Sequence, residues 1–191
     1  MVVFDLDGLL WSPELYQMDM PLRKVPASGG VSSVVVDSYG YELSLYAGAR
    51  RALAELHFLP RFEGTHVAYA SRTHQKKDAT RAFEWISVSA NEAAEGKDDG
   101  GDASTATMAE IASHVQIRSG SKQAHFHALS EASGVRFEDM LFLDNERWNI
   151  TEVSKLGVLS VYCPNGLTAH EWERALKEWA KRAKRRASAV R

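Results

Sequence analysis

Phe4-Asp5-Leu6-Asp7-Gly8-Leu9 follows the apolar pair Val2-Val3 at the start of the chain. The apolar residues indicate a short buried strand, and Gly8 indicates a turn directly after it. Asp5 and Asp7 then place two carboxylates in one small volume, where like charges repel unless a divalent metal or a shared proton lies between them. A simpler interpretation remains open at this point, because a strand-end aspartate followed by a turn-forming Asp-Gly gives the same pattern.

The composition is that of a globular protein of ordinary size. The chain has 191 residues, of which 45% are hydrophobic and 25% are charged, and this predicts one domain over residues 1–180. No apolar stretch approaches the ~20 residues needed to cross a bilayer, so we expect no membrane partner. The single cysteine, Cys163, cannot form an internal disulfide, which favours a reducing, cytoplasmic location.

Apolar runs alternate with helix-length segments along most of the chain. Four runs predict buried parallel strands, at residues 2–4, 66–70, 140–143 and 158–162. Helices are expected at residues 48–59, 74–86, 122–133 and 148–156, and from Thr168 to about residue 183. We therefore predict an α/β fold, a three-layer Rossmann-like parallel sheet with helices on both faces and a small inserted β-hairpin cap.

Three segments depart from this alternation. Residues 31–46 alternate around Ser38-Tyr39-Gly40, which predicts the hairpin, placed where it can overhang a site. Residues 90–107 lack large apolar side chains, so we expect a mobile acidic surface loop there. Residues 181–191 are rich in basic side chains. We interpret them as the solvated end of a helix, where positive charge interacts favourably with the helix dipole. Binding to an anionic surface or to nucleic acid remains an alternative.

Polar groups gather at one edge of the predicted sheet. In open α/β sheets, ligands bind outside the carboxyl ends of the strands. At that edge the chain places Asp5 and Asp7, Ser71-Arg72-Thr73, Gly120-Ser121-Lys122 and Asp144-Asn145-Glu146. Each has an ordinary alternative: a helix cap for Ser71, a solvated surface residue for Lys122 and a strand-end turn for Asp144. Together and in this order they indicate phosphate chemistry.

These motifs resemble those of haloacid dehalogenase superfamily phosphatases over nearly the whole chain. The similarity is greatest to the magnesium-dependent phosphatase family, which is acid-phosphatase-like, compact and minimally capped. The matching residues are Asp5-Leu6-Asp7 with Trp11, Ala70-Ser71-Arg72-Thr73, Gly120-Ser121-Lys122 and Asp144-Asn145-Glu146-Arg147 with Asn149. Trp11 either lines the site entrance or packs in the core. The resemblance implies that the hairpin at residues 31–46 is the minimal cap, which leaves the site open to bulky substrates.

The resemblance also implies a Mg²⁺-dependent phosphomonoesterase and a role for each site residue. Asp5 is the implied nucleophile that forms an aspartyl-phosphate, and Asp7 the implied general acid and base, which requires a raised pKa. Mg²⁺ is expected at the carboxylates of Asp5 and Asp144 and at the backbone carbonyl of Asp7. Substrate phosphate is expected to bind Ser71, Lys122 and Arg72, although Arg72 could instead pair with Glu146. The implied substrates are phosphotyrosine-like or sugar-phosphate monoesters, as small molecules or attached to proteins.

Asn145 is the main departure from that family, whose members commonly carry a second aspartate there. The missing charge is expected to weaken Mg²⁺ binding roughly ten- to hundredfold, unless Glu146 compensates. Leu9 replaces the usual Thr or Val and keeps an apolar side chain. Two other functions stay open: a catalytically weakened binding or regulatory module with this fold, and a nucleic-acid end phosphatase that uses residues 181–191. We do not favour nucleic acid as a partner of this protein.

Overall fold

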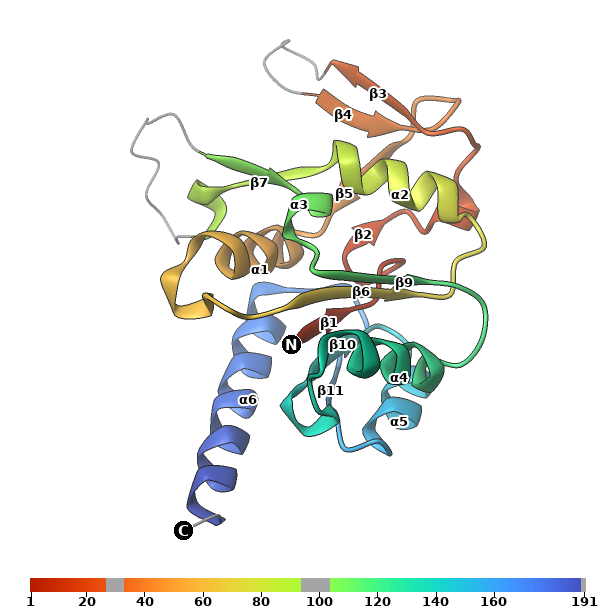
Figure 1. The fold of residues 1–191 in the computed structure, drawn as a ribbon. Helices are drawn as coiled ribbons and strands as arrows, with labels where there is room; N and C mark the ends of the chain where they lie inside the picture. The colour runs from red at the N-terminus through yellow and green to blue at the C-terminus, as the bar shows by residue number, and fades with distance from the viewer. Residues whose placement is uncertain (27–32, 94–103, 190–191) are drawn as a thin grey trace.

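A parallel sheet of five strands lies at the centre of the computed structural model, which describes residues 1–26, 33–93 and 104–189 (Figure 1). The strands, in the order in which they lie side by side, are β11 Leu159–Tyr162, β10 Leu141–Asp144, β1 Val2–Phe4, β6 Val67–Ser71 and β9 His114–Ile117. In the parallel register, Phe4 lies beside Leu143 on one side and Tyr69 on the other. The residues that follow β1, β6 and β10 therefore meet at one edge of the sheet.

Helices cover both faces of this sheet because its strands are apolar on both faces. Val2 and Phe4 pack in one buried cluster with four helices, and Val3 packs in a second cluster with two others. The first group comprises α1 Ala47–Phe58, α2 Lys76–Trp85, α3 Met108–Ile111 and α6 Ala169–Ala189. The second comprises α4 Lys122–Ser133 and α5 Arg147–Ser154. The predicted three-layer α/β architecture is thus confirmed (Figure 1).

The structure also contains an antiparallel sheet of four strands (Figure 1). Its order is β2 Trp11–Ser12, β5 Glu42–Leu45, β4 Ser33–Val36 and β3 Arg23–Pro26. The turn between β4 and β5 is held by Asp37, whose carboxylate accepts the backbone N–H groups of Tyr39 and Tyr41, each at 2.9 Å. The sequence indicated only this hairpin, of which residues 31–32 lie outside the described residues, and did not indicate β2 or β3.

Two further differences concern segments with weak apolar patterns. The fifth central strand, β9, was not expected, because it buries only Ile117 fully. The predicted loop at residues 90–107 begins with the 3₁₀ turn η3 Ala90–Ala93 and ends with β8 Thr105–Thr107, which pairs with β7 Ser87–Ser89. Residues 94–103 of that loop lie outside the described residues. The remaining 3₁₀ turns are η1 Leu15–Gln17, η2 Pro60–Phe62 and η4 Phe137–Asp139.

The last helix, α6, continues to Ala189, beyond the expected end near residue 183. Its basic side chains explain the extra length: Arg182 donates to the backbone oxygen of Gly157, and Arg186 donates to Asp139 at 2.6 Å. Gly157 and Asp139 precede β11 and β10, so this end of α6 lies at the amino-terminal edge of the sheet. Among the described helices, none is long and apolar enough to span a membrane.

Candidate active site

The carboxyl ends of the central strands enclose a pocket of about 200 Å³. Its lining consists of Asp5, Asp7, Glu14, Ser71, Arg72, Thr73, Lys122, Asn145, Glu146 and Asn149. Five of the residues predicted from the sequence, Asp5, Asp7, Ser71, Arg72 and Lys122, thus share one cavity. The sixth, Asp144, is fully buried and contacts Lys122. Residues more than a hundred positions apart in the chain are brought together because their parallel strands end at the same edge.

The loop after β1 depends on Gly8. Its φ of +69° lies in the left-handed region, which favours glycine. A Cβ atom built on Gly8 would lie 2.5 Å from Nδ2 of Asn145. The tight turn that the sequence predicted at Gly8 is therefore confirmed, and it lets the loop that carries Asp7 pack directly against the segment after β10.

The Asp7 carboxylate is fixed by residues that follow it in the chain. Its Oδ1 accepts the indole N–H of Trp11 at 2.8 Å and the backbone N–H of Leu15 at 2.9 Å. Burial raises the pKa of Asp7, and these two hydrogen bonds offset part of that increase. Trp11 is fully buried, so it packs in the core and also orients an acid at the edge of the pocket.

Lys122 lies between the carboxylates of Asp5 and Asp144, the two acids expected to hold Mg²⁺. It is the first residue of α4 and is only 1% exposed. Its ammonium donates to Asp5 and to the backbone oxygen of Ala70, and lies 3.3 Å from Oδ2 of Asp144. The surface-lysine alternative is wrong for this residue, because a solvated lysine would not be buried between two acids.

Asp144 is held in place on both oxygens. Its Oδ1 accepts the backbone N–H of Glu146 at 2.6 Å, and its Oδ2 accepts Nδ2 of Asn149 at 2.9 Å. Burial, followed by the nearby charge of Asp5, raises the pKa of Asp144, whereas the ammonium of Lys122 lowers it. The arrangement therefore concentrates negative charge that a cation would stabilise.

Ser71 and Arg72 contribute hydrogen-bond donors on the other side of the pocket. Oγ of Ser71 accepts the backbone N–H of Thr73 at 3.1 Å, so its own O–H remains available to donate. Ser71 is 2% exposed. Arg72 forms no ion pair with any described residue, Glu146 included, and its exposed guanidinium is free to bind an anion.

The sequence did not single out Glu14 as a site residue or predict how Asn145 and Asn149 present their oxygens. Glu14 lines the same cavity as Asp5, Asp7 and Glu146, and burial, followed by the charges of these acids, raises its pKa. The side-chain oxygens of Asn145 and Asn149 are buried in the pocket wall without a hydrogen-bond partner. Asn149 already belonged to the motif that begins at Asp144, whereas no sequence signal marks Glu14.

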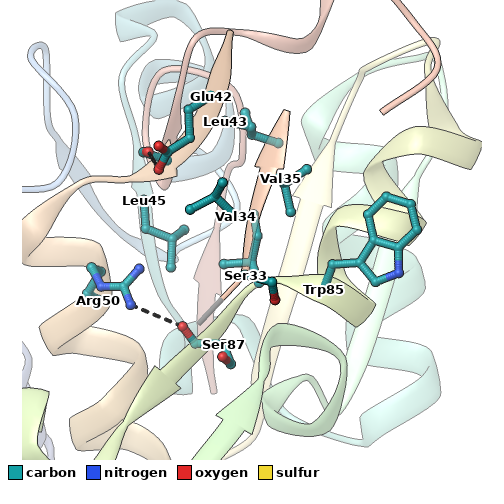
Figure 2. Close-up of a pocket in the computed structure, with 11 residues that line it drawn as sticks. Ser33, Val34, Val35, Glu42, Leu43, Leu45, Arg50, Trp85 and Ser87 are labelled. Atoms are coloured by element: carbon teal, nitrogen blue, oxygen red, sulfur yellow. Dashed lines mark hydrogen bonds between the residues drawn. The ribbon is translucent and has the colours of Figure 1, made fainter. Parts of the chain in front are cut away.

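Figure 2 shows a second pocket, of about 210 Å³, between the β4–β5 hairpin and β7. Arg50 of α1 donates to the backbone oxygen of Ser87 at 3.2 Å (Figure 2). It also pairs with Glu92 at 2.5 Å. None of the site residues predicted from the sequence lines this pocket, although the structure describes all of them. It is therefore distinct from the cavity at the strand ends.

Comparison with known proteins agrees with this geometry. A model of the acid phosphatase family matches residues 1–182. Human magnesium-dependent phosphatase 1 is 31% identical over 182 residues, which cover 95% of this chain and 87% of that protein. A HAD-like hydrolase superfamily protein of Schizosaccharomyces pombe is 31% identical over 158 residues, 82% of this chain and 81% of its own length.

A solved structure supports the fold. It is the N-terminal part of a Bacteroides fragilis protein containing a phosphatase domain, complexed with Mg, and it matches with a TM-score of 0.50 at 14% sequence identity. The match covers 92% of this chain and 38% of that one. The family match and the two relatives confirm the resemblance that the motifs indicated: the chain belongs to the acid phosphatase family of the haloacid dehalogenase superfamily and is a phosphatase.

Proposed function

We propose that this phosphatase is a Mg²⁺-dependent phosphomonoesterase that works through an aspartyl-phosphate on Asp5. The observation that carries the proposal is the convergence of Asp5, Lys122 and Asp144, with Ser71 and Asp7 in the same cavity. A nucleophilic carboxylate, a fixed cation, a hydroxyl donor and a second acid are the groups that transfer of a phosphoryl group to a carboxylate requires.

The residues present fit Mg²⁺. No three His, Cys, Asp or Glu side chains converge as a metal site in the described ranges, but the proposed set needs only the carboxylates of Asp5 and Asp144 and the backbone carbonyl of Asp7. The buried, unpartnered side-chain oxygens of Asn145 and Asn149 line the same cavity and suit a cation with its water ligands. Bound there, Mg²⁺ would neutralise charge on the carboxylates and on the phosphate oxygens.

The first half-reaction uses both acids of the opening motif. A carboxylate oxygen of Asp5 forms a bond to phosphorus while the bond from phosphorus to the leaving oxygen breaks. Protonated Asp7 gives its proton to that oxygen. Burial raises the pKa of Asp7, which increases the fraction of the carboxyl that holds the proton.

In the second half-reaction, ionised Asp7 accepts a proton from water. The water oxygen bonds to phosphorus, and the bond to Asp5 breaks, which regenerates the carboxylate and releases phosphate. Throughout, the O–H of Ser71, the ammonium of Lys122 and the guanidinium of Arg72 stabilise the charge on the phosphoryl oxygens. None of these donors has to move far, since each lines the cavity already.

The substrate class remains that implied by the resemblance: phosphotyrosine-like or sugar-phosphate monoesters, small or attached to proteins. The β4–β5 hairpin within residues 31–46 is the proposed minimal cap. A cytoplasmic location is proposed from the single cysteine, Cys163, whose thiol is free and buried. A substrate panel assayed with Mg²⁺ would define the preferred ester.

Phosphate release from an aryl phosphate tests the proposal. Wild type with Mg²⁺ should turn over, whereas Asp5→Asn and EDTA-treated wild type should not. Asp19→Asn is the matched control, because Asp19 is exposed and lies outside the cavity, and it should retain wild-type activity. Equal rates in all samples would refute the mechanism, and an inert wild type that Asn145→Asp activates would favour the binding-module alternative.

A further inference from the structure

A basic surface adjoins the catalytic cavity along α2. The segment Ser71–Thr73 lines the cavity, and the chain then enters a hollow of about 780 Å³ at the start of α2. Its lining is His74, Gln75, Lys76, Lys77, Asp78, Thr80 and Arg81. The hollow is therefore a continuation of the wall that carries Ser71 and Arg72.

The cations of this wall are available to a ligand. Lys76 and Lys77 are exposed and form no ion pair with any residue in the described part of the chain. The single acid of the hollow, Asp78, is turned toward the protein, where it accepts the backbone N–H of Leu22 at 3.4 Å and lies 3.5 Å from Arg81. The exposed charge of the hollow is thus positive.

The opposite wall of the cavity is acidic. Glu146 follows β10, which lies on the other side of β1 from β6, and Glu14 lies with Asn145 beside Gly8. Both acids line the cavity with Asp7, and their mutual repulsion contributes to the raised pKa of Glu14. An anionic group that extends from the reacting phosphate is repelled by this wall and attracted by the lysines of α2. An anionic leaving group is therefore expected to extend from the cavity toward α2.

We propose that the enzyme prefers small phosphomonoesters whose leaving group carries a second anionic group, bound by Lys76 and Lys77. The inference rests on the proposed phosphomonoesterase activity. The second anion is a carboxylate or a phosphate, since both accept hydrogen bonds from ammonium groups. Lys76 and Lys77 determine specificity and do not act on the reacting atoms.

Matched substrate pairs test this proposal. The probes are alkyl phosphates that end in a carboxylate and the corresponding terminal amides, with alkyl chains of increasing length, so that only the distal charge differs within a pair. For wild type with Mg²⁺, kcat/KM should be about fivefold higher for the carboxylate at the best chain length, the upper range for an exposed charge pair. Added salt should reduce this ratio, because the lysines are exposed.

The variants are Lys76→Gln/Lys77→Gln and a control, Lys181→Gln/Lys184→Gln. The control removes the same charge from exposed positions of α6 at the opposite edge of the sheet. The α2 variant should hydrolyse the amides as wild type does and lose the carboxylate preference, whereas the control should keep it. A wild-type ratio near one, or a ratio that survives in the α2 variant, would overturn the inference and leave the phosphatase mechanism standing. If wild type hydrolyses an aryl phosphate but neither member of any pair, the inference is also overturned; if it hydrolyses none of these esters, the phosphomonoesterase proposal itself fails.

Discussion

Replacing Lys122 by methionine keeps a long side chain in the core and removes the ammonium between Asp5 and Asp144. The ammonium lies 3.3 Å from Oδ2 of Asp144, a separation at which opposite charges attract by about 5 kcal/mol with an effective dielectric constant near 20. Desolvation of the lysine offsets part of this gain, and breaking one partner out of a buried pair costs ~3–5 kcal/mol in proteins. We expect the free energy of unfolding of Lys122→Met, measured in urea with EDTA, to be ~3–5 kcal/mol lower than that of wild type.

The loss should depend on pH and on Mg²⁺. Lys122 lowers the pKa of Asp144, which burial and Asp5 raise. Without Lys122, Asp144 holds its proton to higher pH in the folded variant than in the unfolded chain, so the free energy of unfolding of the variant decreases as pH rises. The difference in stability between wild type and Lys122→Met should therefore be larger at about pH 8 than at about pH 5. Mg²⁺ supplies the missing positive charge, so it should raise the stability of the variant more than that of wild type.

Urea denaturation of wild type, Lys122→Met and the exposed control Lys181→Met, each with EDTA or with Mg²⁺, measures these effects. A loss below about 1 kcal/mol in EDTA, within the range of ordinary surface substitutions, would refute the view that the ammonium neutralises two buried carboxylates. Equal stabilisation of wild type and variant by Mg²⁺ would refute the proposed metal position. Turnover of the folded variant should fall roughly 10²- to 10³-fold, the usual cost of removing one donor to a transition-state oxyanion.

Three other predictions follow from buried polar contacts. Trp11→Phe removes the 2.8 Å hydrogen bond to Asp7. Because hydrogen bonds to charged groups contribute ~1.5–3 kcal/mol, kcat on an aryl phosphate should fall at least about tenfold. An unchanged kcat would contradict the role of this bond. Glu55→Ala removes a carboxylate that is 2% exposed, pairs with Arg51 at 2.8 Å and accepts the indole N–H of Trp172 at 3.1 Å. The free energy of unfolding in urea should drop by about 3 kcal/mol with kcat per folded molecule unchanged, and a drop below about 1 kcal/mol would be inconsistent with this ion pair. Burial lowers the pKa of His125 from 6.5 to about 4, so the unfolded chain binds the extra proton at higher pH than the folded protein does. The free energy of unfolding of wild type should therefore fall as pH decreases from about 6.5 to about 4, and that of His125→Gln should fall less. Identical pH profiles would show that His125 does not titrate there.

The sequence predicted the site well where chemistry and topology coincide. Asp5, Ser71 and Asp144 each end or follow an apolar run, and parallel strands place their carboxyl ends together whatever the details of packing. Lys122 was placed at that same edge because it begins the helix expected at residues 122–133, and the resemblance implied its role. In the structure Ser121 caps this helix, with Oγ accepting the backbone N–H of Ala124 at 3.2 Å.

The rest of the site depends on loop geometry that no periodic pattern encodes. Glu14 reaches the cavity only because the loop after β1 folds back through the Asp7–Trp11 contact and the 3₁₀ turn at Leu15–Gln17. The fold shows the same limit. His114–Ile117 forms an edge strand with one fully buried residue, too little burial to mark it as a strand, and β3 is mostly exposed and acquires its structure from pairing with β4.

The central place of β1 has a consequence for synthesis of the protein. β1 is made first, its neighbour β6 ends at Ser71, and its other neighbour β10 begins only at Leu141. At typical translation rates of ~5–20 residues per second, the interval between the two neighbours lasts roughly 4 to 15 s. During that time one edge of β1 has no partner to pair with and is open to association with other chains. A ribosome-bound intermediate of this length also lacks Asp144, a proposed Mg²⁺ ligand, so we expect no phosphatase activity before the last central strands emerge.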